Sequence, residues 1–368
     1  MCLCHLQIAS IRDIISHMKT IVQKINKDNI NREELKAAAD ILRNGGLVAF
    51  PTETVYGLGG DGLREDAAKK IYAAKGRPSD NPLIIHISNM EMLEELTTEI
   101  SEKAKLLADK FWPGPLTMIF PKSEKVPFGT TGGLNTVAVR MPDHPVALAL
   151  IEESGVSIAA PSANTSGRPS PTLAEHVYED MDGKIEMILD GGKVGIGIES
   201  TIVDLTEEVP MILRPGYITK AMLEEVIGPV EIDKAILSTA PDANLVPKAP
   251  GMKYKHYAPK GDLTIFEGEE DKVVSEINER LKEKLSKGNR VGIIATTETK
   301  ERYLGGEVVV IGSRTDEGEI ASSLYEILRN FDQMEVDYIF SESFASDDLG
   351  QAIMNRLLKA AGYQVVCV

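Results

Sequence analysis

The sequence predicts an α/β protein with two domains joined by a long connecting segment. Its 368 residues exceed the usual length of a single domain. Before residue 235, apolar runs typical of strands outnumber the helical patterns, which predicts a mixed sheet. After residue 262, strand and helix patterns alternate strictly, which predicts a small parallel α/β domain of Rossmann-like outline.

Charge and cysteine content narrow the possible classes of function. The chain has 40 Lys and Arg against 56 Asp and Glu, so its formal net charge is −16. This acidity disfavours non-specific nucleic-acid binding, although a local basic cleft is compatible with it. Three cysteines near the chain ends, Cys2, Cys4 and Cys367, cannot build a disulfide framework and fit a reducing cytoplasm. We expect a cytoplasmic protein without a membrane partner, because no apolar run approaches the ~20 residues that cross a bilayer.

Residues 18–235 form the larger predicted domain, after an N-terminal extension of residues 1–17. A capped helix is expected at 31–46, where a helical pattern ends at a glycine pair. One continuous helix is expected at 91–112, because its helical spacing persists until Pro113. The other elements are predicted as helices at 64–76, 145–155 and 172–180, and as strands at 18–25, 47–50, 82–87, 116–120, 136–141, 156–160, 186–190, 200–205 and 210–214.

The remainder of the chain divides into a linker and a second domain. Residues 236–262 are rich in proline and show no periodic pattern, so we predict a linker that acts as a lid. Residues 263–368 form the predicted C-terminal domain. Its strands are predicted at 263–266, 290–296, 307–312, 337–342 and 364–368, and its helices at 270–288, 319–334 and 348–362.

The segment Gly57–Gly62, GLGGDG, matches the G-x-G-x-x-G pattern of a dinucleotide-binding turn. In such folds the first glycine directly follows a strand, and an acidic residue ends the next strand. Here residues 51–56 intervene after the strand at 47–50, and Asp80 precedes the next strand. We therefore disfavour a nicotinamide-dependent dehydrogenase and expect these glycines in tight turns that let a ligand approach closely.

Three polar loops are the best candidates for a site. Loop 51–57 has several hydroxyl side chains, and loop 75–82 places Lys75 and Arg77 between prolines that stiffen it. Loop 160–172 follows a predicted buried strand and is rich in hydroxyl and amide groups. Each loop alone could be an ordinary solvated turn. Two rigid, cationic, hydroxyl-rich loops beside strand ends favour a site for phosphate or carboxylate groups.

Two arginines support this anion site. Arg140 and Arg214 each end an apolar strand, where an arginine is commonly a surface residue; beside a candidate anion site we expect both to point into it. His86 lies within a strand, where a lone histidine is usually a core or packing residue. The sequence has no H-E-x-x-H motif, so we expect any Mg²⁺ to arrive with nucleotide phosphates. The central expectation is that Arg77, Arg140, Ser162 and Arg214 converge on one pocket.

Seven motifs occur in a fixed order: PTETVYGLG, KGRP with NPL, PGPLT, VAVRMPDHP, PSANTSG, ESTIVDL and LRPG. Together they resemble the YrdC/Sua5 family, the threonylcarbamoyl-AMP synthases. The resemblance covers residues 18–230 and implies a twisted, open α/β sheet. The segment APGMKYKHYAP at 249–259, followed by a small α/β domain, is similar to the two-domain Sua5 form.

This resemblance implies a reaction and a set of site residues. L-threonine, bicarbonate and ATP, with its Mg²⁺, would give L-threonylcarbamoyl-AMP and pyrophosphate. The catalytic signatures of the family fall on Lys75, Arg77, Ser162 and Asn164. Contacts to ATP are implied for Arg77, Asn81, Thr136, Ser162, Ser170, Arg214 and Tyr254. Contacts to threonine are implied for Thr54, His86, Arg140, the backbone of Ala160, and Ser200.

The product of this reaction would be handed to a transferase machinery that makes N6-threonylcarbamoyladenosine in tRNA. We expect no stable RNA binding by this chain. The alternative is an RNA-binding module whose basic concave surface holds RNA without adenylate chemistry. The acidic balance and the absence of interleaved aromatic residues weigh against that alternative.

Overall fold

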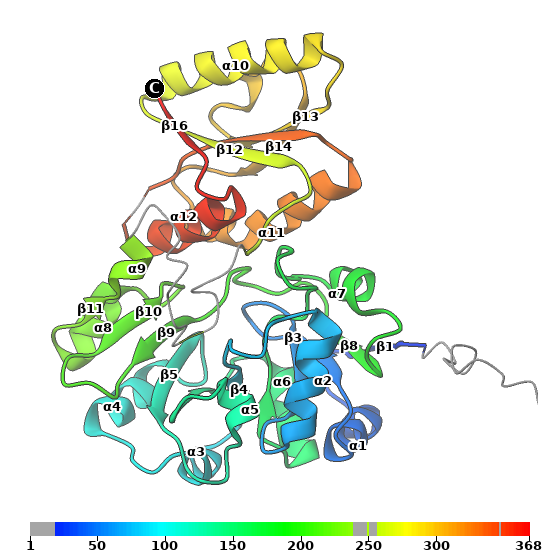
Figure 1. The fold of residues 1–368 in the computed structure, drawn as a ribbon, viewed down its shortest axis with the longest axis vertical. Coiled ribbons are helices and arrows are strands. Elements are labelled where there is room, and N and C mark those ends of the chain that lie inside the picture. Colours follow the sequence, from blue (N-terminus) through cyan, green and yellow to red (C-terminus); the bar gives the residue numbers. More distant parts are fainter. Residues whose placement is uncertain (1–18, 238–248, 250–255, 346) are drawn as a thin grey trace, which may run out of the picture.

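The computed structural model describes residues 19–237, 249, 256–345 and 347–368, and it contains two sheets stacked one above the other (Figure 1). The predicted extension 1–17, most of the linker and Tyr254 lie outside the described residues. The larger sheet has 11 strands in the order β1 (Ile21–Lys24), β8 (Met187–Asp190), β2 (Val48–Phe50), β3 (Gly57–Asp61), β7 (Ile158–Ala159), β4 (Ile84–His86), β6 (Thr136–Arg140), β5 (Leu116–Pro121), β9 (Thr201–Asp204), β10 (Met211–Arg214) and β11 (Glu231–Ile232).

Parallel and antiparallel pairs both occur in this sheet, so the predicted mixed sheet is confirmed. The smaller sheet has five parallel strands in the order β14 (Glu307–Gly312), β13 (Val291–Thr296), β15 (Tyr338–Glu342), β12 (Asp262–Glu267) and β16 (Val365–Cys367). This confirms the small parallel α/β domain, although its strand order differs from that of a dinucleotide-binding fold. The predicted domain boundaries stay predictions.

Helices cover both faces of the larger sheet. Alternate residues of β2 face opposite sides: Val48 and Phe50 pack with α1 and α6, whereas Ala49 packs in the core under α2, α3 and α4. The helices of this domain are α1 (Lys36–Arg43, after the short 3-10 turn Arg32–Leu35), α2 (Glu65–Lys75), α3 (Met90–Leu96), α4 (Glu102–Phe111), α5 (Phe128–Thr131), α6 (Pro145–Ser154), α7 (Ala174–Met181), α8 (Lys220–Ile227) and α9 (Lys234–Leu237).

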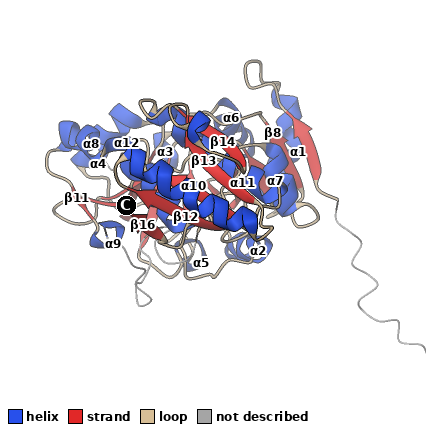
Figure 2. Ribbon diagram, turned by 90° about the horizontal axis from the view of Figure 1, so that it is seen from above, coloured by secondary structure: helices blue, strands red, loops and turns tan. Residues whose placement is uncertain are grey.

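The C-terminal domain sits on the larger domain through two of its helices. Helix α10 (Glu270–Ser286) covers the outer face of the small sheet, and Figure 2 shows it lying over the strands. Helices α11 (Glu317–Gln333) and α12 (Asp348–Ala360) cover the other face, toward the larger domain (Figure 1). Val55 and Ile198 of the larger domain belong to the same buried cluster as these helices, so one hydrophobic core crosses the boundary.

The expected single helix at 91–112 is wrong. The chain forms α3 and α4 instead, separated by a polar, β-branched stretch that begins at Thr97. Thr97 forms an isolated β-bridge with Lys122, and Ser101 caps α4 by accepting a hydrogen bond from the backbone of Ala104 at 3.2 Å. The helical spacing is therefore overridden by a side-chain cap and a tertiary backbone contact.

The expectation of tight turns at 57–62 is also wrong for most of the segment, because Gly57–Asp61 is strand β3. The strand pairs antiparallel with both β2 and β7. A Cβ on Gly59 would lie 2.7 Å from Ile158 Cγ2 and 2.8 Å from Phe50 Cε1, so only glycine fits between these side chains. The glycines permit close packing in the sheet.

We expect Gly59→Ala to lower the free energy of unfolding by about 1–3 kcal/mol, because the added methyl group overpacks a buried strand. The matched control is Gly195→Ala, since a Cβ there meets nothing within 4 Å. Urea denaturation of both variants measures the difference. Equal stability of the two variants would show that the sheet absorbs the methyl group without strain.

Candidate active site

A pocket of about 700 Å³, its open mouth included, lies over the middle of the larger sheet. It occupies the sheet face that α1 and α6 cover elsewhere, because Ile84, His86 and Ala160 all point to that side. The sequence-predicted residues that line the pocket are Thr54, Lys75, Arg77, His86, Arg140, Ala160, Ser162, Asn164, Ser200 and Arg214. Arg77, Arg140, Ser162 and Arg214 therefore do meet in one pocket.

Neighbouring strands place His86 and Arg140 side by side. Strands β4 and β6 run parallel, and His86 is the register partner of Arg140. Arg140 Nη1 donates to Thr54 Oγ1 at 2.9 Å, and its Nη2 lies 2.5 Å from Glu53 Oε1. Arg140 Nε donates to the Gly114 carbonyl at 3.2 Å. The guanidinium is thus held in a fixed orientation at this end of the pocket.

At the other side of the pocket, the antiparallel strands β9 and β10 position Arg214. It ends β10, where the register with β9 shifts between Ile212 and Arg214. Its Nε donates to the Ser200 carbonyl at 3.0 Å, and its Nη2 donates to Ser200 Oγ at 3.1 Å. Ser200 Oγ also lies 2.8 Å from Thr117 Oγ1. Arg214 is almost fully buried, so these bonds fix its charge inside the protein.

The end of α2 brings two cations to the pocket. Lys75 is the last residue of the helix, and Gly76 follows in the left-handed conformation, with φ of 61°, which turns the chain toward Arg77. Lys75 Nζ donates to the carbonyls of Ser162 and Asn164, the second at 2.6 Å. The Lys75 ammonium therefore binds loop 160–172, whereas Arg77 Nε has no hydrogen-bond partner among the described residues.

The lining has more positive than negative charge, although the whole chain is acidic. Its charged members are the cations Lys75, Arg77, Arg140 and Arg214 and the single carboxylate Glu199. Four lining side chains have a buried nitrogen without a hydrogen-bond partner among the described residues: Arg77 Nε, His86 Nδ1, Arg140 Nη2 and His256 Nε2. Buried polar atoms are rarely left unpaired, so these nitrogens indicate where a ligand would bind.

Burial and mutual repulsion shift the pKa values of these groups. Burial, with the nearby charge of Arg77, lowers the pKa of Lys75 well below its usual value. Burial lowers the pKa of Arg77 to about 10 and also lowers that of Arg214. Burial, helped by the charge of Arg140, lowers the pKa of His86 to about 3, so this imidazole is neutral. Concentrating cations here is unfavourable without an anion, and an anionic ligand would relieve it.

Three of the sequence-predicted residues that the structure describes do not line the pocket. Asn81 and Thr136 lie outside the lining, and the Asn81 side chain is buried. Ser170 is fully buried and donates to Glu199 Oε1 at 2.6 Å, so it acts through a lining residue. Tyr254 lies outside the described residues. The roles implied for these four side chains stay predictions.

Sequence reasoning missed several residues at the site. His256 and Tyr257, from the end of the linker, line the pocket. Glu199 lines it as well, and Glu53 pairs with Arg140 behind the lining. Although burial opposes its ionisation, the charges of Arg356 and Arg214 lower the pKa of Glu199 to about 2. Motif spacing could have found His256 and Tyr257, but nothing in the sequence pairs Glu199 with Arg356.

The described residues offer no group of three or more His, Cys, Asp or Glu side chains that could hold a metal ion. Glu199 is occupied by the Arg356 guanidinium, its Oε2 lying 3.0 Å from Arg356 Nε. Each helix in the described part of the chain is too short or too polar to cross a membrane.

Comparisons with known proteins agree with this geometry. Residues 40–216 match the family model described as telomere recombination, and residues 218–362 match the model described as threonylcarbamoyl-AMP synthase, C-terminal domain. A threonylcarbamoyl-AMP synthase from Bacillus subtilis is 51% identical over 337 residues, which cover 91% of this chain and 95% of that protein. Another from Pyrococcus abyssi is 51% identical over 342 residues, or 93% and 98%.

A solved structure gives the same assignment. The crystal structure of P. abyssi Sua5 complexed with L-threonine has a TM-score of 0.89 and 50% sequence identity, and covers 95% of this chain and 100% of that chain. The open mixed sheet with its cationic pocket and the small parallel sheet define a two-domain α/β protein whose site suits an anionic ligand. The chain belongs to the threonylcarbamoyl-AMP synthase family, in its two-domain Sua5 form.

The buried histidine should make the protein less stable in acid. Because the pKa of His86 is lowered to about 3, unfolding takes up a proton when the pH is below the ordinary histidine pKa of about 6.5. The stability that neutral His86 contributes is therefore present above pH 6.5 and is lost as the pH falls toward 3. We expect His86→Gln to reduce the slope of unfolding free energy near pH 5 by about 1.4 kcal/mol per pH unit.

Urea denaturation between pH 4.5 and pH 7.5 measures this slope. His144→Gln should behave in the same way, because burial lowers the pKa of His144 to about 4. An unchanged slope in both variants would mean that these imidazoles accept protons in the folded protein.

Proposed function

We propose that this chain condenses L-threonine, bicarbonate and ATP into L-threonylcarbamoyl-AMP and pyrophosphate within the pocket described above. The observation that best supports this is the four-to-one excess of cations over carboxylates among its lining side chains. An acidic chain that buries such an excess provides a specific site for a polyanion. The proposed reaction presents a triphosphate, a carboxylate and a carbamate to the same pocket.

The proposed reaction has two bond-forming steps. The threonine nitrogen bonds to the carbon of bicarbonate, and water leaves, which gives threonine carbamate. A carbamate oxygen then attacks the α-phosphorus of ATP, and the bond from that phosphorus to the bridging oxygen of pyrophosphate breaks. Such phosphorus chemistry depends mostly on positioning and on fixed positive charge. We assign Arg77 and Arg214 to stabilise the charge that develops on the phosphates.

The structure supports a more indirect role for the loop signatures. Lys75 Nζ binds the carbonyls of Ser162 and Asn164, and Ser162 Oγ donates to Asn164 Oδ1 at 2.5 Å. Asn164 Nδ2 donates to the carbonyls of Thr165 and Arg168, each at 2.9 Å. These bonds fix the shape of the loop, whose residues Ser162, Asn164, Ser166 and Gly167 line the pocket. Lys75 would therefore contribute positive charge close to the phosphates while it holds the loop.

The threonine side of the pocket is assigned to residues around Arg140. Arg140 Nη2 has an ion pair with Glu53 but no hydrogen-bond acceptor among the described residues, so it can bind the threonine carboxylate. Neutral His86 lies beside it and leaves a nitrogen for a polar substrate group. Thr54 supplies a hydroxyl group beside Arg140, and Ser200 supplies another beside Arg214.

A cover over the pocket would protect the carbamate, which is short-lived in water. His256 and Tyr257 form part of the pocket wall, and the Tyr257 ring stacks on Tyr325 with centroids 5.1 Å apart. This anchoring supports the proposal that the linker acts as a lid. Since the described residues contain no group that could cage a metal, we propose that Mg²⁺ enters as part of MgATP.

This assignment makes the chain a nucleotidyltransferase that transfers the adenylyl group of ATP. We propose that its product passes to a transferase that acts on tRNA, and that the reaction takes place in the cytoplasm. The RNA-binding alternative is not favoured, because the basic residues lie inside a pocket rather than along an exposed surface.

We expect the purified protein to release pyrophosphate from MgATP only when L-threonine and bicarbonate are both present. Omission of either substrate should reduce the rate to background, because the carbamate cannot form. A coupled pyrophosphate assay measures this, and mass spectrometry identifies the adenylate. Pyrophosphate release that is independent of threonine would contradict the proposed reaction.

We expect Arg77→Ala to reduce kcat by about a hundredfold or more, because a fixed charge beside the phosphates is removed. The fold should persist, since Arg77 follows α2 and its hydrogen bonds to described residues are two long ones, at 3.3 and 3.4 Å. Arg64→Ala is the matched control, because Arg64 precedes the same helix and pairs with Asp66 at the surface. Similar rates for the two variants would exclude the phosphate role of Arg77.

A further inference from the structure

The two largest side chains that are fully buried in the described part of the chain are both arginines, Arg329 and Arg356. Both belong to the C-terminal domain, on α11 and α12, and both point into the larger domain. Burying a guanidinium is unfavourable unless all of its charge is well paired. Two such groups at one domain boundary indicate a role beyond packing.

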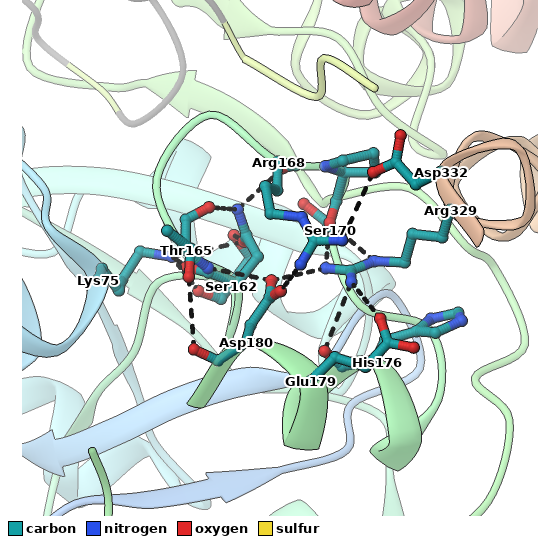
Figure 3. Close-up of polar contacts among 12 residues, drawn as sticks. Lys75, Ser162, Thr165, Arg168, Ser170, His176, Glu179, Asp180, Arg329 and Asp332 are labelled. Atoms are coloured by element: carbon teal, nitrogen blue, oxygen red, sulfur yellow. Dashed lines mark hydrogen bonds and ion pairs between the residues drawn. The ribbon is translucent and has the colours of Figure 1, made fainter. Parts of the chain in front are cut away.

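Arg329 binds the backbone of the pocket loop. Its Nε and Nη2 both donate to the Pro169 carbonyl, at 3.1 and 2.7 Å, in a forked contact (Figure 3). Its Nη2 also donates to Asp180 Oδ2 at 2.8 Å. The remaining nitrogen lies 3.5 Å from the carbonyl of His176 on α7. A residue of the C-terminal domain thus holds loop 160–172, three positions before its end.

Asp180 extends this hold to the earlier part of the loop. Its Oδ2 accepts a hydrogen bond from the backbone of Thr165 at 3.1 Å, and its Oδ1 is paired with Arg168 (Figure 3). Arg168 also lies 3.4 Å from Asp332, one helical turn after Arg329 on α11. Asp180 of α7, together with Arg329 and Asp332 of α11, therefore fixes the loop at residues 165, 168 and 169.

Arg356 is linked to Ser170, near the end of the same loop, through the carboxylate of Glu199. Its Nε donates to Glu199 Oε2 at 3.0 Å, and the Tyr325 hydroxyl donates to the same oxygen at 2.8 Å. The other oxygen, Oε1, accepts from Ser170 Oγ at 2.6 Å. The pKa of Glu199 is lowered to about 2, so it stays ionised and keeps Arg356 paired. Ser170 is thus linked to α12 by two consecutive hydrogen bonds.

We propose that Arg329 and Arg356 are positioning residues for the ATP site. From the C-terminal domain they fix residues 165–170, so that the docking of α11 and α12 completes the loop that binds ATP. This inference rests on the proposed function, which assigns the loop to ATP. Lys75 fixes the first part of the loop from within the larger domain, at Ser162 and Asn164, and the two arginines fix the remainder.

The family also contains proteins that match only about half of this chain. A threonylcarbamoyl-AMP synthase from Pseudomonas aeruginosa is 35% identical over 181 residues, which cover 49% of this chain and 96% of that protein. In this chain, residues of the C-terminal domain bind the loop. The physical benefit is preorganisation, since a loop fixed before binding needs no ordering when ATP arrives.

Arg329→Lys in the full chain tests the proposal. Lysine keeps a positive charge near Asp180 but lacks the planar fork that binds the Pro169 carbonyl twice. We expect the Kd for α,β-methylene-ATP, measured by calorimetry, to rise about tenfold or more. The KM for threonine should change less than about threefold, because residues 165–170 lie outside the side assigned to threonine.

Gln333→Ala is the matched control. Gln333 lies on the same helix and donates to Glu179 Oε1 of α7 at 2.9 Å, across the same domain boundary, but it does not contact the loop. Its nucleotide affinity should equal that of the unaltered protein. Equal affinity of Arg329→Lys and Gln333→Ala would overturn the proposal, because the loop would then not depend on the forked contact.

A second variant keeps the test decisive if Arg329→Lys does not fold. Arg356→Lys changes the contact to Glu199 and leaves Arg329 in place; circular dichroism and thermal melting report whether each variant is folded. A folded Arg356→Lys with unchanged nucleotide affinity would also count against the proposal. If the unaltered protein binds the analogue but releases no pyrophosphate with threonine and bicarbonate, the proposed function fails, while the affinity comparison still decides the role of the arginines.

Discussion

A buried ammonium group is the interaction on which the pocket depends. Lys75 Nζ has the Ser162 and Asn164 carbonyls as acceptors, and it is almost fully buried. Carbonyl oxygens bring no formal charge, so they accept hydrogen bonds from Lys75 without forming an ion pair, and burial lowers its pKa well below the usual value. The loop is thereby tied to the end of α2, and a bound anion would favour the charged form of Lys75. Holding the loop and attracting a ligand are two results of one arrangement.

Buried cations also lie at the domain boundary, but there they are paired with carboxylates. Arg329 binds a carbonyl and the carboxylate of Asp180, and Arg356 binds the carboxylate of Glu199. Here each cation meets an acidic partner, so the boundary is close to neutral and rigid, whereas the pocket stays electropositive. Arg140 is an exception within the pocket, because it is paired with Glu53 and still has a nitrogen, Nη2, without a hydrogen-bond acceptor among the described residues.

Sequence patterns predicted the two sheets and most of the pocket because those features depend on local periodicity and on loop composition. Arg140 and Arg214 were found as strand ends, and the structure brings both to the pocket. The break between α3 and α4 was missed because it depends on a bridge from Thr97 to Lys122, which no local pattern reveals. Glu199 was missed because its importance lies in a partner more than 150 residues away.

The hydrophobic cluster that crosses the boundary has a consequence for how the molecule loses its structure. Val55 and Ile198 pack in the same apolar cluster as α11 and α12, and Tyr257 belongs to it too. Separating the two halves would expose this surface to water together with two unpaired guanidinium groups. The chain should therefore melt as one cooperative unit, in a single transition, even though it is built from two sheets.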